Sequence, residues 1–93
     1  MPGRPEIPVD PRAPFADFAN GLRALRAASK KTYQEISDEV FYRVSTLCMA
    51  SSGRILPSLE VTLAYVRSCG GSVSEWTRRW EEARQRRSRG SAA

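Results

Sequence analysis

The sequence predicts an all-α fold, a compact domain of five helices with a helix-turn-helix near its centre. From Phe15 onward, apolar side chains recur at steps of three and four residues, the spacing of one helix face. At two places, from Thr32 to Glu35 and from Ser72 to Glu75, a hydroxyl residue precedes a glutamate by three positions, as in the first turn of a capped helix. Glycine and proline residues at 53, 57, 70 and 71 separate the later stretches.

The first three helices are predicted in close succession. The first runs from Phe15 to Ser29 or Lys30, and its apolar face consists of Phe15, Phe18, Leu22, Leu25 and Ala28. A cap at Thr32 starts a second helix that ends near residue 40. A third helix, at about 43–50, begins two or three residues later, because Val44 and Leu47 resume helical spacing. A short helix, a tight turn and another short helix form a helix-turn-helix.

Two more helices follow the loop at Gly53. Pro57 and Ser58 open the fourth helix, and Gly70 with Gly71 ends it. Its predicted apolar stripe is Leu59, Leu63 and Val66, flanked by Val61 and Tyr65. The fifth helix starts at Ser72 and carries on one face Val73, Trp76, Trp80 and Ala83. Two tryptophans four residues apart predict that this helix docks onto the domain.

The two ends of the chain differ from the domain, which is predicted at 15–83. Proline occupies positions 2, 5, 8, 11 and 14, and this period of three favours a flexible, extended polyproline II arm at 1–14. Such an arm is either a ligand for an aromatic groove or a disordered leader, and the second is favoured. Residues 84–93 have no apolar face and are predicted as a basic, disordered tail.

Composition narrows the functional class. The 93 residues suffice for one domain, and no apolar run approaches the roughly 18 residues of a membrane span. The first ten residues have no apolar stretch of the kind a secretory signal needs. We therefore expect a cytoplasmic protein without a membrane partner, in which Cys48 and Cys69 are reduced thiols.

The chain has no histidine, which removes the Ser-His-Asp triad, the Cys-His pair and the histidine-containing zinc sites. Two cysteines alone cannot complete a structural zinc site. We expect no enzyme activity, no cofactor and no bound metal.

The net charge of +5 is unevenly distributed. Residues 15–75 carry seven basic and six acidic side chains, whereas residues 76–93 carry six arginines and two glutamates. The excess positive charge is therefore in the C-terminal segment, and the overall charge is weak support for nucleic-acid binding by the central domain.

Residues 22–80 resemble the Cro/repressor-type (XRE-class) helix-turn-helix domains that are abundant in high-GC bacteria. The matching segments are LRAL at 22–25, TYQEIS at 32–37, STL at 45–47, GRILPS at 53–58, VTLAYVRSCGG at 61–71 and EW…RW at 75–80. Thirteen arginines against two lysines fit such a genome. The resemblance implies a five-helix domain whose third helix is a recognition helix, in a sequence-specific DNA-binding transcriptional regulator.

By this resemblance, the predicted base contacts are Arg43, Val44, Ser45, Thr46 and Met49. An arginine can bond a guanine edge at two atoms, serine and threonine offer single hydrogen bonds, and valine can contact a thymine methyl group. The predicted phosphate contacts are Lys30, Lys31, Thr32, Gln34 and Arg54. For the first four of these, the alternative is that the threonine only caps the helix and the lysines are solvated.

The turn before the third helix departs from the family pattern. Relatives often have glycine there, whereas this chain has Phe41 and Tyr42. Because an aromatic residue at positive φ costs about 1–2 kcal/mol, we expect a different turn path or a buried Phe41. Arg43 stands at the cap position of the third helix, and its side chain cannot accept an amide hydrogen bond.

Two functional hypotheses follow. In the first, the protein regulates transcription by binding double-stranded DNA, as a dimer on paired half-sites. In the second, it is a protein-interaction adaptor or an N-terminal regulatory module that keeps the fold without reading bases. The near-neutral central domain and the apolar side chains Val44 and Met49 motivate the second hypothesis.

Overall fold

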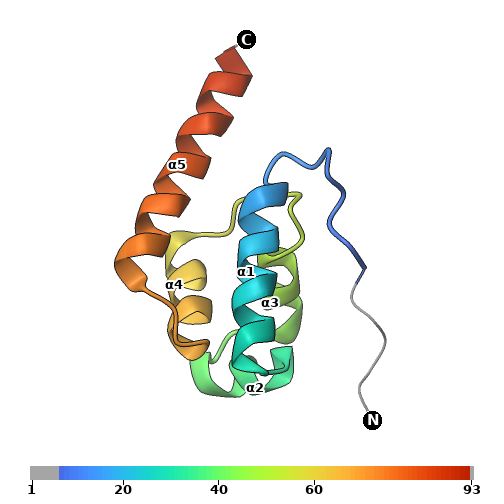
Figure 1. Ribbon diagram of the computed structural model, residues 1–93, viewed down its shortest axis with the longest axis vertical. Helices are drawn as coiled ribbons and strands as arrows, with labels where there is room; N and C mark the ends of the chain where they lie inside the picture. The colour runs from blue at the N-terminus through green and yellow to red at the C-terminus, as the bar shows by residue number, and fades with distance from the viewer. Residues whose placement is uncertain (1–6, 93) are drawn as a thin grey trace.

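The computed structural model describes the backbone of residues 7–92 and the side chains of residues 7–86. This part of the chain forms five α-helices and no strand, so the prediction of an all-α fold is confirmed (Figure 1). The helices are α1 (Ala16–Ser29), α2 (Tyr33–Val40), α3 (Val44–Ala50), α4 (Leu59–Ser68) and α5 (Val73–Ala92). None of them is long and apolar enough to cross a membrane.

One hydrophobic core joins all five helices. Its most deeply buried side chains come from α1 to α4, and Trp76 and Ala83 add the contribution of α5; the former are Leu22, Ile36, Leu47, Tyr65 and Val66. Because α2 and α3 each bury little apolar surface of their own, their positions depend on this shared core rather than on intrinsic helix stability.

Side chains at the helix starts hold the first turns. Thr32 Oγ1 accepts a hydrogen bond from the Glu35 amide at 3.1 Å, and Glu35 Oε1 accepts one from the Thr32 amide at 2.8 Å. This capping box is therefore confirmed. At α5, the Ser72 hydroxyl accepts a bond from the Glu75 amide at 3.2 Å, which is one half of the second predicted box.

The buried face of α4 is rotated relative to the predicted one. Thr62, Tyr65 and Val66 are fully buried, whereas Leu59 and Leu63 are only half-buried. The Thr62 hydroxyl donates to the Ser58 carbonyl oxygen at 2.9 Å, so burial leaves this polar group satisfied. The sequence pattern favoured the leucines because threonine is not counted as an apolar residue, even where it is buried.

Two tryptophans fix α5 to the rest of the domain, Trp76 against α1 and Trp80 against the loop before α4. Trp76 is 4% exposed and meets the Phe18 ring edge to face, with 5.5 Å between the ring centroids. A Cβ added at Gly21 would lie 2.9 Å from the Trp76 ring, so a glycine in the middle of α1 is what admits the indole. Trp80 is half-buried, and its indole Nε1 donates to the Pro57 carbonyl oxygen at 2.7 Å. The predicted docking of this helix is present.

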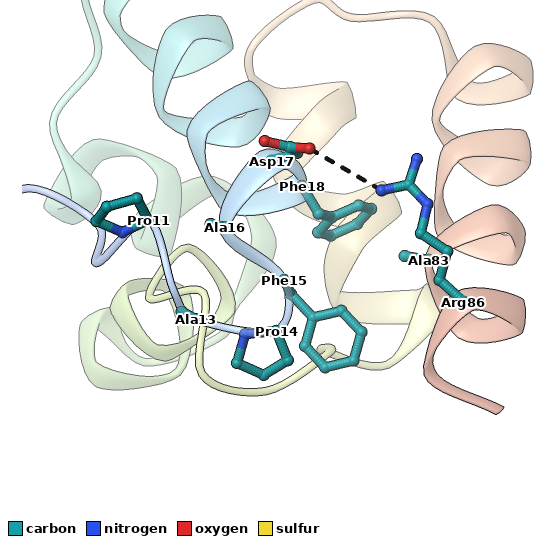
Figure 2. Close-up of a pocket in the computed structure, with 9 residues that line it drawn as sticks. All are labelled: Pro11, Ala13, Pro14, Phe15, Ala16, Asp17, Phe18, Ala83 and Arg86. Carbon is teal, nitrogen blue, oxygen red and sulfur yellow. Dashed lines mark ion pairs between the residues drawn. The ribbon is translucent and has the colours of Figure 1, made fainter. Parts of the chain in front are cut away.

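The crossing of α1 and α5 leaves a small hollow at the surface (Figure 2). Phe15, Phe18 and Ala83 form its apolar wall, and Arg86 reaches toward Asp17 across it at 3.9 Å. Both charged side chains are largely exposed, so water screens this pair and it adds little stability. The hollow lies at the outer edge of the contact between α1 and α5.

The helix α5 continues to Ala92, and Figure 1 shows its last turns projecting beyond the other helices. The sequence had predicted a disordered tail from Arg84, so the backbone differs from that expectation. Arginine, glutamine and glutamate have high helix propensity, and Glu82 precedes Arg86 by one turn, the favourable order for opposite charges. These local preferences extend the helix without an apolar face.

Residues 7–14 pack onto the domain instead of forming an extended arm. The Ala13 amide donates to the Asp10 carbonyl oxygen at 2.9 Å, which closes a turn, and Val9 is buried. The predicted flexible polyproline II arm is thus not confirmed for this segment, because a buried valine and a turn hold it against the domain. The prediction for residues 1–6 lies outside the described part of the chain.

Candidate nucleic-acid interface

The connection between α2 and α3 is three residues long. Phe41 ends α2 in the left-handed conformation with φ of 64°, and its amide donates to the Ser37 carbonyl oxygen at 2.9 Å. The Ser37 hydroxyl donates to the Tyr42 carbonyl oxygen and closes the turn from the other side. Arg43 then precedes α3 in an extended conformation, with no side-chain cap, as its chemistry predicts.

The expectation for Phe41 is wrong on both counts. The residue takes the positive φ that was thought too costly, and its side chain is 92% exposed. The physical reason is the length of the turn: reversing the chain within three residues requires a left-handed residue after α2, and the sequence places a phenylalanine there. The structure therefore carries both a strained backbone and an exposed aromatic ring at one position.

Replacing Phe41 by glycine should stabilise the fold by about 1 kcal/mol, because glycine takes positive φ without strain and little buried surface is lost. Thermal unfolding followed by circular dichroism should show a rise of roughly 4–8 °C. The matched control is Phe41→Ala, which removes the ring but keeps the strain and should not stabilise. A Phe41→Gly protein that is no more stable than the parent chain would show that the turn is not strained.

The helix α3 is anchored by one face and exposed on the other. Leu47 and Ala50 are buried, with exposed fractions of 0% and 2%. The exposed residues are Arg43 at its start and Ser45, Cys48 and Met49 along its length. Val44 and Thr46 are half-buried. Of the five predicted base contacts, three therefore lie on the open face and two at its edges.

The predicted phosphate contacts flank this face at two places. Lys30, Thr32 and Gln34 are exposed near the start of α2, and Arg54 is exposed in the loop after α3. Thr32 is occupied as a helix cap, as one of the two alternatives proposed, and Gln34 donates to Asp38 on the same helix at 3.0 Å. Lys30 ends α1 with φ of 59°.

Lys31 is tied into a hydrogen-bond network within the protein. Its ammonium group donates to both oxygens of Glu39, at 2.8 and 2.9 Å, and to the Ser68 carbonyl oxygen at 2.5 Å. The Ser68 hydroxyl donates to Glu39 at 2.6 Å. The network joins both ends of α2 to the end of α4. A phosphate contact by Lys31 would compete with these hydrogen bonds.

The network makes stability depend on pH. The hydrogen bonds from Lys31 and then from Ser68 hold the pKa of Glu39 below its ordinary value of 4.5. Because the folded pKa is depressed, the stabilisation is present above the unfolded pKa and is lost as the pH falls through the folded pKa. We expect Glu39→Gln to reduce the urea midpoint more at pH 7 than at pH 3.

The control for this measurement is Glu81→Gln, which removes an exposed carboxylate in the middle of α5 that lies outside the network. Its effect on the urea midpoint should be the same at the two pH values. A constant difference between Glu39→Gln and the parent chain across this range would contradict the assigned role of Glu39.

A second network fixes the end of α3. The Tyr33 and Ser51 hydroxyls are 2.7 Å apart, and the Arg26 guanidinium lies over the Tyr33 ring at 4.4 Å. Tyr65 packs edge to face against Tyr33, and burial, reinforced by that tyrosine, raises the pKa of the Tyr65 phenol. These contacts link α1, α2 and α4 to the residue that follows α3, so both ends of α3 are held.

The sequence did not reveal an apolar hollow beside the exposed face of α3. Met49, Ile55 and Val61 line a depression of about 360 Å³ between α3 and the start of α4, with Ser45 and Thr46 at its margin. Met49 is 50% and Ile55 47% exposed. Ile55 lies in a loop, where no periodicity indicates which way a side chain points, so no signal in the sequence could have placed it here.

Among the residues that the structure describes, no group of three or more cysteine and acidic side chains is arranged to hold a metal ion. No family model matches the chain, and neither a curated protein nor a solved structure shows significant similarity to it.

Proposed function

We propose that the protein is a sequence-specific DNA-binding transcriptional regulator in which α2 and α3 form a helix-turn-helix and α3 enters the major groove. The observation that carries the proposal is the open face of α3, which bears hydrogen-bonding side chains while Leu47 and Ala50 anchor the opposite face. A short helix held rigidly by its core face can present base-reading groups at fixed positions.

The dimensions of α3 suit this role. Seven residues make a helix about 10 Å long, and the major groove is about 12 Å wide. Arg43, exposed at the N-terminal end, has the reach for a two-atom contact with guanine. Ser45 and Met49 lie on the open face, and Thr46 and Val44 border it. These five side chains offer one strong base contact and several weaker ones.

Phosphate contacts would flank this helix on both sides. Exposed Lys30 and Gln34 lie beside the start of α2, where the helix dipole favours an anion, and Arg54 lies beyond the end of α3. We assign Lys31 a smaller part than the sequence suggested, because Glu39 already neutralises it.

A single helix with one strong base contact reads few positions, so we propose that two copies bind paired half-sites about 34–36 Å apart. Such a homodimer would double the number of base contacts, while each α3 would make the same few contacts. A DNA regulator of this kind would work in the bacterial cytoplasm, where its two cysteines remain reduced.

The experiment that tests the proposal is selection of bound sequences from random double-stranded DNA. A consensus should emerge, and Arg43→Ala should relax one position of it at a cost of about 1–3 kcal/mol. Arg67→Ala, which removes an exposed arginine on α4, is the matched control and should leave the consensus intact. Micromolar binding that ignores sequence and disappears with salt would contradict the proposal.

One observation favours a second candidate, a protein-interaction adaptor. The apolar hollow lined by Met49, Ile55 and Val61 adjoins the same face of α3, and exposed apolar surface of this kind is typical of partner contacts. The two functions respond differently to substitution. Loss of function on Met49→Asp, with Arg43→Ala and Thr46→Ala without effect, would favour the adaptor.

A further inference from the structure

A basic hollow lies on the other side of the loop that follows α3. Arg12, Arg23, Arg54 and Ser52 line it together with Asp10, in a depression of about 470 Å³ between residues 7–14 and that loop. We infer that Arg12 and Arg54 together hold one DNA phosphate, so that the docked N-terminal segment is part of the DNA-binding surface. This inference rests on the proposed function. It adds residues 7–14, which the sequence analysis interpreted as part of a leader, to the DNA-binding surface.

The N-terminal segment is fixed to the loop by packing and hydrogen bonds. Val9 is 9% exposed and lies over Gly53, where an added Cβ would be 2.7 Å from the valine Cγ1. Gly53 has φ of 84°, so the loop takes a path that favours glycine and leaves room for the valine. The Phe15 amide donates to the Gly53 carbonyl oxygen at 3.0 Å. The segment and the loop therefore form one unit.

Arg23 joins this unit to α1. Its Nε donates to the Ser51 carbonyl oxygen at 2.8 Å, and its Nη1 donates to the carbonyl oxygen of Ile7. These bonds fix its position, so Arg23 ties the unit to α1.

The charges around the hollow favour an anion. Arg12 and Arg54 are both exposed, and neither guanidinium makes an ion pair or hydrogen bond with another described residue. The Asp10 carboxylate is the opposing charge, and it accepts a hydrogen bond from the Arg12 backbone amide at 2.9 Å. The Arg12 and Arg54 guanidinium groups against the Asp10 carboxylate leave the hollow positive. Guanidinium groups bind phosphate oxygens strongly and with defined geometry.

The hollow continues the open face of α3. Ser45, Met49 and Ser52 follow one another at steps of four and three residues, and the Ser52 hydroxyl donates to the Met49 carbonyl oxygen at 2.7 Å. Because a helix of about 10 Å nearly spans a groove about 12 Å wide, each of its ends lies near a phosphate backbone. The backbone beyond the C-terminal end of α3 would meet the hollow at Ser52.

The test is the salt dependence of binding to a random-sequence duplex, measured by fluorescence anisotropy with the full chain. Arg12→Gln should weaken binding equally for all sequences and reduce the slope of log K against log salt by up to about 0.9, the value for one complete phosphate contact, because Arg54 retains part of that contact. Arg78→Gln, an exposed arginine on α5, is the matched control and should leave the slope unchanged. An unchanged slope in Arg12→Gln would overturn the inference.

A second variant tests the role of docking. Val9→Ser removes the apolar contact without changing any charge, and it should lower the slope as much as Arg12→Gln does. The double variant should lose no more than either single variant, since both remove the same contact. Circular dichroism verifies that the helices remain. If Val9→Ser binds like the parent chain, Arg12 does not depend on the docked segment, and the inference is wrong.

The outcomes separate this inference from the proposed function. Selection that yields a consensus, together with an unchanged slope for Arg12→Gln, overturns only the phosphate contact. Selection without any consensus overturns sequence-specific regulation, and the salt slope then still decides whether Arg12 contacts the duplex. A parent chain that fails to bind any duplex overturns both.

Discussion

Trp76→Ala is expected to destabilise the fold by about 3–5 kcal/mol, the largest effect of any single substitution considered. The indole is 4% exposed, lies against Gly21 and packs on Phe18, and the Arg79 guanidinium stacks on its outer side at 4.6 Å. Alanine leaves a cavity that the neighbouring side chains cannot fill. Because a domain of this size has about 5–15 kcal/mol in total, much of its stability should disappear.

Urea unfolding followed by far-ultraviolet circular dichroism measures this loss. Arg78→Ala, two positions further along the exposed side of α5, is the control and should change stability by less than about 0.5 kcal/mol. A loss below about 1 kcal/mol for Trp76→Ala would mean that α5 does not dock on α1 as described.

Leu47→Ala is expected to cost about 2–5 kcal/mol and to act on the candidate interface as well. Leu47 is fully buried and is the main apolar anchor of α3, which has seven residues and no side-chain cap. An isolated helix of this length is unstable in water, so α3 depends on that anchor. Unfolding by urea gives the energetic loss, and DNA binding should weaken in parallel.

Ser45→Ala provides the comparison for Leu47→Ala, because it alters the exposed face of the same helix and leaves the core untouched. Its effect on stability should stay within about 0.5 kcal/mol. If Leu47→Ala bound DNA with unchanged affinity at a urea concentration that unfolds most of the variant, α3 could not be the element that contacts the duplex.

Much of the fold could be predicted because it depends on local signals. The Thr32 capping box placed the start of α2, the spacing of Val44 and Leu47 placed α3, and Gly70 with Gly71 placed the end of α4 to within a few residues. Caps and apolar periods act over one or two helical turns, and neighbouring residues in the sequence suffice to reveal them.

Features that depend on contacts between distant segments could not be predicted. Lys31 contacts Glu39 and Ser68 only when α2 and α4 pack together, and no residue near Lys31 in the sequence indicates these hydrogen bonds. The docking of Val9 over Gly53 likewise joins positions far apart in the chain. The prediction for Phe41 was wrong for another reason. The short turn requires a positive φ at this position, and this requirement outweighs the low propensity of an aromatic residue for it.

The candidate interface was predictable in part. The family resemblance predicted five outward side chains at α3, and the structure has Arg43, Ser45 and Met49 exposed but Val44 and Thr46 half-buried. Ile55 and Arg12 lie in non-helical segments, where phase gives no direction. Their places beside α3 and the following loop are therefore results of the three-dimensional structure alone.

The hydrogen bond between Trp80 and Pro57 sets a lower limit on how far the chain can be shortened. This bond restrains the segment leading into α4, and Ala83, one turn further on, is still buried. A truncation before residue 80 would release that restraint and would leave apolar side chains of α1 facing water. A minimal folded unit must therefore extend at least to Ala83, and shorter fragments should be prone to aggregation.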